Sequence, residues 1–184
     1  MAVMLPKSRD CMLVVVDVQE RLCPAMTGLD DAVAVMSKVV QAADILGVDI
    51  VVTEQYPRGL GSTIPAIRDV VPNSSPTLTK TTFSCWGADG FLAAVEGRGV
   101  RTLVLIGMET HVCVQQTALE ELERGYDVVL PADAICSRKG EDRNRALTFM
   151  QANGVSVTTF ESLVFSWLED AKHPCFKAVA GLVK

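Results

Sequence analysis

Short apolar runs rich in β-branched residues alternate with segments of helical periodicity along almost the whole chain. The run MLVVVDV (12–18) is continuous rather than alternating, which is typical of a strand buried on both faces. The segment 29–47 has helical periodicity, acidic residues in its first turn and a glycine at its end. Strands separated by helices in this order pair in parallel through right-handed crossovers. The pattern predicts a three-layer, Rossmann-like α/β fold with helices on both faces of a parallel sheet.

The same signals place the remaining elements, and they show no linker, repeat or low-complexity segment. Strands are expected at 12–18, 48–55, 76–83, 102–107, 126–133 and 155–160, and helices at 29–47, 63–71, 88–99, 112–124, 141–154, 161–171 and within 173–184. We therefore expect residues 1–184 to form a single domain. Ligands of such sheets bind beyond the carboxyl ends of the strands, where the strand order reverses.

Composition narrows the class of partner. The chain has 184 residues, of which 49% are hydrophobic, enough for one substantial core, and a net charge of -5. That charge gives no general attraction to nucleic acid or anionic lipid, and acidic residues interrupt the one locally basic stretch, 137–145. No apolar run approaches the roughly 18 residues of a membrane helix, and the one near the N-terminus is too short for a signal peptide. We expect a soluble, cytoplasmic protein that binds a small molecule, with no nucleic acid or membrane partner.

Cysteine and histidine usage argues against structural disulfides and zinc. The six cysteines show no C-x-x-C pair and no regular spacing, so reduced thiols are expected. The only histidines, His111 and His173, are far apart in the sequence. A zinc site of ordinary composition is poorly supplied, and we expect neither a metal nor a cofactor.

Three strand ends carry reactive side chains. Asp17 closes the first strand, Lys80 lies near the end of the third, and Cys113 follows the fourth. Taken singly, each has an ordinary explanation: a helix or loop cap, an edge-strand charge, and a small buried hydrophobe. Together they suggest a nucleophile with its base. A helix beginning near Val112 and a neighbouring ammonium would both favour a Cys113 thiolate, and a carboxylate within reach could carry its proton.

The sequence resembles a known family, the isochorismatase-like cysteine hydrolases, over nearly its whole length. The matching motifs are VVVDVQERL (14–22), LTKTTFSCW (78–86) and LIGMETHVCVQQTALEELERGYDVVLPADAICSR (105–138). The resemblance implies an Asp17, Lys80, Cys113 triad and a six-stranded parallel sheet of order 3-2-1-4-5-6. It also implies a cis peptide bond between Met108 and Glu109, oxyanion binding by the N–H groups of Glu109 and Cys113, and a homo-oligomer.

One segment departs from the metal-dependent members of that family. Nicotinamidase-type members carry an aspartate and histidines after the second strand, whereas VTEQYPRGLGSTIPAI (52–67) contains no histidine. The resemblance therefore implies neither a metal nor specificity for a pyridine carboxamide. The segment EQYPRGLG is more similar to a subgroup called isochorismatase-domain proteins.

Five further residues near the strand ends are candidates for the substrate pocket. Tyr56, Phe83 and Trp86 lie close to strand ends, where core packing is the first explanation and pocket lining the second. Gln19 could position a loop by hydrogen bonds or serve an ordinary turn. His111, beside the nucleophile turn, could contact substrate or lie exposed in the loop.

Three functions remain open at this stage. The first is a metal-independent amidase-type hydrolase that cleaves a C–N bond of a small carboxamide or ureido compound through a Cys113 thioester. The second is an isochorismatase-type vinyl ether hydrolase, which needs general acid catalysis rather than a thiol nucleophile. The third is a binding or scaffold protein that keeps a vestigial site.

Overall fold

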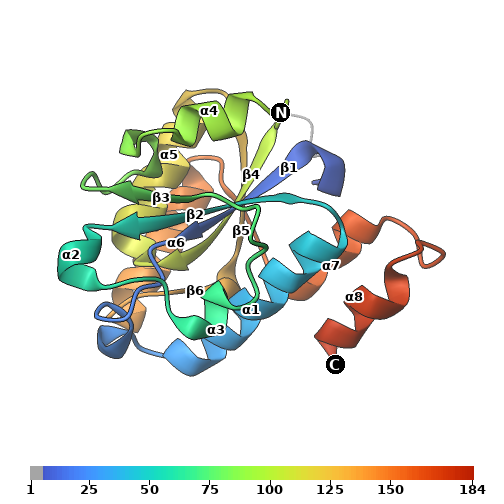
Figure 1. Ribbon diagram of the computed structural model, residues 1–184, viewed down its shortest axis with the longest axis horizontal. Coiled ribbons are helices and arrows are strands. Elements are labelled where there is room, and N and C mark those ends of the chain that lie inside the picture. The colour runs from blue at the N-terminus through green and yellow to red at the C-terminus, as the bar shows by residue number, and fades with distance from the viewer. Residues whose placement is uncertain (1–5) are drawn as a thin grey trace.

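A parallel β-sheet forms the centre of the computed structural model, which describes residues 6–184 (Figure 1). Within these residues, six strands lie in the order β3-β2-β1-β4-β5-β7, and a short β6 pairs with β4 beyond the end of β5. The predicted fold and strand order are confirmed, with β7 in the place of the expected sixth strand. The bounds are β1 Cys11–Val16, β2 Asp49–Gln55, β3 Thr77–Lys80, β4 Thr102–Met108, β5 Asp127–Pro131, β6 Ile135–Cys136 and β7 Ser156–Thr158.

Helices cover both faces of this sheet, and each face has its own apolar cluster. One face packs against α1 (Leu29–Ile45), α3 (Pro65–Arg68), α7 (Phe160–Leu168) and α8 (Phe176–Val183); the other packs against α4 (Phe91–Glu96), α5 (Gln115–Glu123) and α6 (Gly140–Ala152). Every residue of β1 and β4 is buried, as the continuous apolar runs predict for central parallel strands. The described helices include none that is both long and apolar enough to cross a membrane.

The chain departs from the predicted elements mainly at the carboxyl edge of the sheet. The predicted strand 126–133 is interrupted by a 3₁₀ turn, Ala132–Ala134, and resumes beside β4 as β6. A short α2 (Pro57–Leu60), which the sequence did not predict, follows β2. The helix after β4 begins earlier than expected, as a π-helical segment, Thr110–Val114, that leads into α5. The predicted helix 63–71 is only one turn, Pro65–Arg68.

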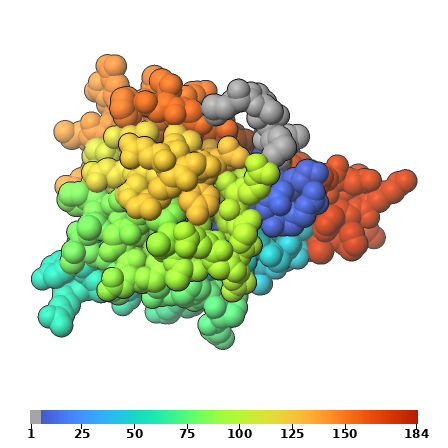
Figure 2. Space-filling view, turned by 90° about the horizontal axis from the view of Figure 1, so that it is seen from above, coloured from blue at the N-terminus to red at the C-terminus, as the bar shows by residue number. Residues whose placement is uncertain are grey.

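The C-terminal segment lies at one side of the molecule (Figure 2). The apolar stretch 175–183 packs α8 against α1 and α7, with Val179 fully buried. An ion pair of 3.0 Å joins Lys7, near the start of the described residues, to Glu169, directly after α7. Packing within one chain therefore accounts for part of this apolar stretch, and homo-oligomer formation stays a prediction.

Candidate active site

The topology brings the three strand-end residues to one edge of the sheet. Asp17 directly follows β1, Lys80 is the last residue of β3, and Cys113 lies in the π-helical segment after β4. Strand β1 lies between β2 and β4, so Asp17 and Cys113 flank the point where the strand order reverses.

Lys80 reaches Asp17 by crossing strand β2. Its Nζ lies 2.6 Å from Asp17 Oδ2, and both side chains are fully buried. The same nitrogen lies 2.9 Å from Gln55 Oε1, 3.0 Å from the Phe83 carbonyl and 3.3 Å from the Thr82 carbonyl. The ammonium is thus surrounded by acceptors, which a buried charge requires. Its donors are committed to these groups, so Lys80 can influence the nearby thiol only through its charge.

Asp17 is held in a fixed orientation by β2. The Thr53 hydroxyl donates to Asp17 Oδ1 at 2.8 Å, and the Asp17 N–H donates to the Thr53 carbonyl at 3.2 Å. The backbone of Asp17 has a φ of 52°, in the left-handed region that a residue with a Cβ rarely adopts. Such strain persists only where the surrounding contacts impose it, and here they aim a carboxylate across the strand ends.

The Cys113 thiol is neutral at rest, contrary to the expected thiolate. Burial raises the pKa of Cys113 above the usual range of a thiol, and the negative charge and hydrogen bonding of Asp17 raise it further. Lys80 opposes this rise but is outweighed, because the thiol loses hydration and Lys80 is paired with Asp17. Cys113 is 6% exposed. The helix start also differs from the expected α-helical N-terminus, since Cys113 lies inside a π-helical turn.

Strands β1 and β4 approach each other closely beside this site. Gly107 has a φ of 119°, and a Cβ there would lie 2.1 Å from the Val16 carbonyl oxygen, so only glycine fits. One residue further along, the peptide bond between Met108 and Glu109 is cis. The Glu109 carboxylate is buried and pairs with Arg138 at 2.9 Å, so its side chain is directed toward the segment after β6.

Four polar residues around the site were not singled out from the sequence. Thr53 and Gln55 hold Asp17 and Lys80, and Thr117 accepts a hydrogen bond from the Cys85 N–H at 3.0 Å and donates one to the Cys113 carbonyl at 2.7 Å. Cys85 itself is completely buried, and burial raises the pKa of its thiol to about 12. The available signals were weak: Cys85 lies within the motif at 78–86, and Thr53 is a polar residue in a buried strand.

Gln19 fastens the loop after β1 to the loop after β2. Its Nε2 donates to the carbonyls of Gln55, at 3.0 Å, and Gly61, at 2.7 Å, and its Oε1 accepts from the Gln55 N–H at 2.8 Å. Gln19 is completely buried. These contacts match the loop-positioning role considered for it.

Two of the candidate pocket aromatics are exposed beside Lys80. Tyr56 is 54% exposed and Phe83 is 52% exposed. The Tyr56 N–H donates to the Lys80 carbonyl at 2.8 Å, and the Phe83 carbonyl accepts from Lys80 Nζ. A hollow of about 400 Å³ lies here, with Tyr56 and Lys80 among its lining residues. Both aromatic residues are thus available to a molecule that approaches this edge.

Trp86 and His111 have partners of their own. The Trp86 ring stacks on Tyr126 with centroids 5.6 Å apart, and the Arg124 guanidinium lies 4.3 Å from its centroid. This environment corresponds to packing over α5. His111 Nδ1 lies 3.0 Å from the Ser137 hydroxyl, which links the π-helical turn that carries Cys113 to the segment after β6.

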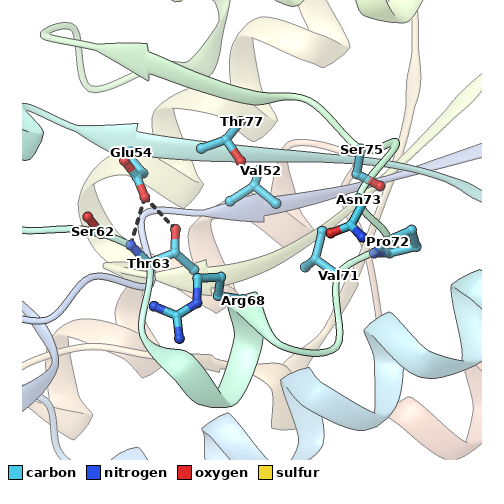
Figure 3. A pocket seen from close by; sticks show the side chains of 10 residues that line it. All are labelled: Val52, Glu54, Ser62, Thr63, Arg68, Val71, Pro72, Asn73, Ser75 and Thr77. Carbon is cyan, nitrogen blue, oxygen red and sulfur yellow. Dashed lines mark hydrogen bonds between the residues drawn. The ribbon is translucent and has the colours of Figure 1, made fainter.

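A second hollow, of about 350 Å³, lies on the α1 and α3 face (Figure 3). One oxygen of Glu54 accepts from the Thr63 N–H at 2.7 Å and from the Thr63 hydroxyl at 2.8 Å, as the dashed lines show. These bonds fix Thr63, at the end of the loop that follows β2. Gln19 holds the start of the same loop at Gln55. Asp17, Lys80 and Cys113 are not among the residues that line this hollow, which are Val52, Glu54, Ser62, Thr63, Arg68, Val71, Pro72, Asn73, Ser75 and Thr77.

Among residues 6–184, no group of three or more histidine, cysteine, aspartate or glutamate side chains is placed to hold a metal ion. The chemistry available at this edge is that of a carboxylate, an ammonium, two thiols and backbone N–H groups.

Fold and site together define a three-layer α/β protein with a buried carboxylate–lysine pair beside a thiol. The isochorismatase domain model matches residues 11–162, and the chain belongs to the isochorismatase family, with its hydrolase fold. It is 41% identical over 168 residues to isochorismatase domain-containing protein 1 of Salmo salar, covering 91% of this chain and 59% of the relative. It is 36% identical over 175 residues to isochorismatase domain-containing protein 2 of Xenopus laevis, covering 95% of this chain and 84% of the relative.

A solved structure agrees over nearly the full length. The MAR1 ribonuclease of Caenorhabditis elegans superposes with a TM-score of 0.91 at 33% identity, covering 97% of this chain and 91% of that one. The chain thus spans less than two thirds of the Salmo salar relative but most of the Xenopus and Caenorhabditis proteins.

Proposed function

We propose that this protein is a metal-independent cysteine hydrolase that cleaves a C–N bond of a small carboxamide or ureido compound. The observation that carries the proposal is the buried Asp17–Lys80 pair, 2.6 Å apart, beside the Cys113 thiol at the carboxyl edge of the sheet. An acyl-transfer site needs a nucleophile, a base within reach and a group that controls the charge of the base.

The neutral thiol determines how the first step begins. Because Cys113 holds its proton at rest, attack on the substrate carbonyl is coupled to transfer of that proton to Asp17. The sulfur forms a bond to the carbonyl carbon, and the carbonyl oxygen becomes an oxyanion. The N–H groups of Glu109 and Cys113 are the proposed donors to that oxygen. Lys80 stabilises the Asp17 carboxylate before the transfer.

Collapse of the tetrahedral intermediate releases the amine. The C–N bond breaks, the leaving nitrogen takes the proton from Asp17, and a Cys113 thioester remains. A water molecule then gives a proton to Asp17 and attacks the thioester. The C–S bond breaks, the thiol regains its proton, and the carboxylic acid is released.

A panel of carboxamides and ureides assayed for ammonia release tests the proposal. We expect turnover by the wild-type protein, loss of turnover in Cys113→Ala, and a mass increase on Cys113 when the reaction is quenched early. Undiminished turnover by Cys113→Ala on an identified substrate would show that the thiol is not the nucleophile.

A vinyl ether hydrolase is the second candidate. Vinyl ether cleavage needs general acid catalysis rather than a thiol nucleophile, and a Cys113 that keeps its proton is a weak nucleophile at rest. This enzyme would release pyruvate from isochorismate and tolerate Cys113→Ser far better than Asp17→Ala. Product analysis for pyruvate against ammonia distinguishes the two reactions.

The same experiment also tests two further alternatives, RNA cleavage and a binding or scaffold role. The Caenorhabditis structure is described as a ribonuclease, so RNA cleavage belongs in the panel, although the net charge of -5 gives no general attraction to a phosphate backbone. A binding or scaffold role predicts no turnover on any substrate, with Cys113 alkylated no faster than Cys11 or Cys175 at pH 7.

A further inference from the structure

Thr53 touches both the proposed base and a second buried thiol. It lies on β2, opposite Val16 in the register of β1, and is completely buried. Its hydroxyl is 2.8 Å from Asp17 Oδ1 and 3.6 Å from Cys85 Sγ. A buried hydroxyl with two polar neighbours must donate to one of them and can accept from the other.

Chemistry fixes the direction of both hydrogen bonds. The Asp17 carboxylate is paired with Lys80 and can only accept, so the single proton of the Thr53 hydroxyl is given to Asp17. The Cys85 thiol must then be the donor to Thr53. Burial keeps that thiol protonated, which is the state that donates. The result is a chain of two hydrogen bonds in one direction: the Cys85 thiol donates to the Thr53 hydroxyl, and that hydroxyl donates to Asp17.

These hydrogen bonds end at one oxygen of Asp17, and Lys80 donates to the other oxygen. Oδ1 accepts from Thr53 and Oδ2 accepts from Lys80, so the carboxylate cannot rotate without breaking a buried hydrogen bond. The titratable groups that face Asp17 are Lys80 from β3, Cys113 from the π-helical turn and Cys85 from the 3₁₀ turn after β3. Of the groups in contact with Asp17, the Thr53 hydroxyl is a neutral donor, and it can be removed without changing the charge of the site.

We infer that Thr53 is a positioning residue for the proposed reaction: its hydroxyl orients the Asp17 carboxylate toward Cys113 and stabilises the anionic form of the Asp17–Cys113 pair. This inference rests on the proposed function, in which Asp17 takes the proton of Cys113. In that step one proton passes from Cys113 to Asp17, so the carboxylate must be charged and directed at the thiol. Removing a hydrogen-bond donor from a carboxylate disfavours its charged form.

The pH dependence of Cys113 alkylation tests this without a known substrate. The rate with iodoacetamide is followed by peptide mass spectrometry between pH 4 and 9 in the full chain. In Thr53→Val, which keeps the shape and loses the hydroxyl, the acidic limb should move up by about one pH unit, which is about tenfold slower alkylation at a pH on the limb. Thr53→Ser keeps the donor and should restore the wild-type limb.

The controls separate a positioning role from a folding defect. Thr102→Val makes the same change at a buried threonine at the opposite end of the sheet and should leave the limb unchanged. Thermal unfolding establishes that each variant is folded; if the valine variant is not, Thr53→Ala takes its place. Limbs of Thr53→Val or Thr53→Ala that coincide with wild type within about 0.3 pH unit would overturn the inference, as would a shift in Thr53→Ser equal to that in the valine variant.

The two proposals fail in different ways. A Cys113→Ala variant with full turnover removes the proposed function. A reactive Cys113 whose alkylation has the same pH dependence with and without the Thr53 hydroxyl is compatible with the proposed hydrolase. It removes only the proposed role of Thr53.

Discussion

We predict that a buried glutamate outside the site makes the stability of this protein depend on pH. Glu121 on α5 is completely buried, and neither carboxylate oxygen has a hydrogen-bond partner among the described residues. Burial raises the pKa of Glu121 well above its ordinary value, with a smaller contribution from the charge of Glu120. The folded protein therefore holds this carboxyl group in its neutral form at pH values where the unfolded chain has already released the proton.

The sign and size of the effect follow from one proton. Below the ordinary pKa of 4.5, both states are protonated and the stabilising contribution is fully present. As the pH rises toward the raised pKa of the folded state, the unfolded chain ionises alone, and the free energy of unfolding falls by about 1.4 kcal/mol for each pH unit. Glu121→Gln has nearly the same shape and no titrating proton, so this slope should disappear.

Urea unfolding at pH 5, 6 and 7, followed by far-ultraviolet circular dichroism, measures the difference. The advantage of Glu121→Gln over wild type should grow with each step in pH, with the m-value unchanged. Glu123→Gln, an exposed neighbour on the same helix, should run parallel to wild type. Parallel curves for Glu121→Gln would refute the reasoning, because they would mean that Glu121 is ionised in the folded protein or partnered there.

Three further predictions concern the site. Lys80→Met and Asp17→Asn should each lower the free energy of unfolding by about 3–5 kcal/mol, because each leaves a buried charge or polar group unpaired, and the double variant should lose less than their sum in a urea double-mutant cycle. Gly107→Ala should cost about 3 kcal/mol or more, since its Cβ would overlap the Val16 carbonyl, whereas Gly140→Ala, with no atom within 4 Å of its Cβ, should change stability by less than about 1 kcal/mol; thermal unfolding compares them. Cys113→Ser should keep the wild-type melting temperature within a few degrees while carboxamide turnover is lost, and a large drop in melting temperature would instead indicate a packing role.

Much of the fold could be predicted because its signals are local and repeated. Continuous β-branched runs marked β1 and β4, and the alternation with helices required parallel pairing. The strand order came from the family resemblance, since periodicity does not say which strands are neighbours. The weak elements were missed for a physical reason: α2 and β6 are a single turn and a two-residue strand, too short to show a period.

The site was predictable only as a set of strand ends. Asp17, Lys80 and Cys113 stand out because each interrupts or closes an apolar run. Thr53 does not stand out, because threonine is common in β-strands. Only the register of β1 and β2 places it against Asp17. The direction of the Cys113 pKa shift was predicted wrongly, because the sequence shows charged neighbours but not the loss of hydration that outweighs them.

In the proposed mechanism the activity depends on an edge strand, because Lys80 is the last residue of β3. Strand β3 has four residues, pairs with a neighbour on one side only and is largely exposed. Terminal strands of this kind open locally at a lower free energy than the centre of a sheet. Each such opening withdraws the ammonium from its carboxylate while the rest of the molecule stays folded. Warming should therefore abolish the proposed activity before circular dichroism registers any loss of helix.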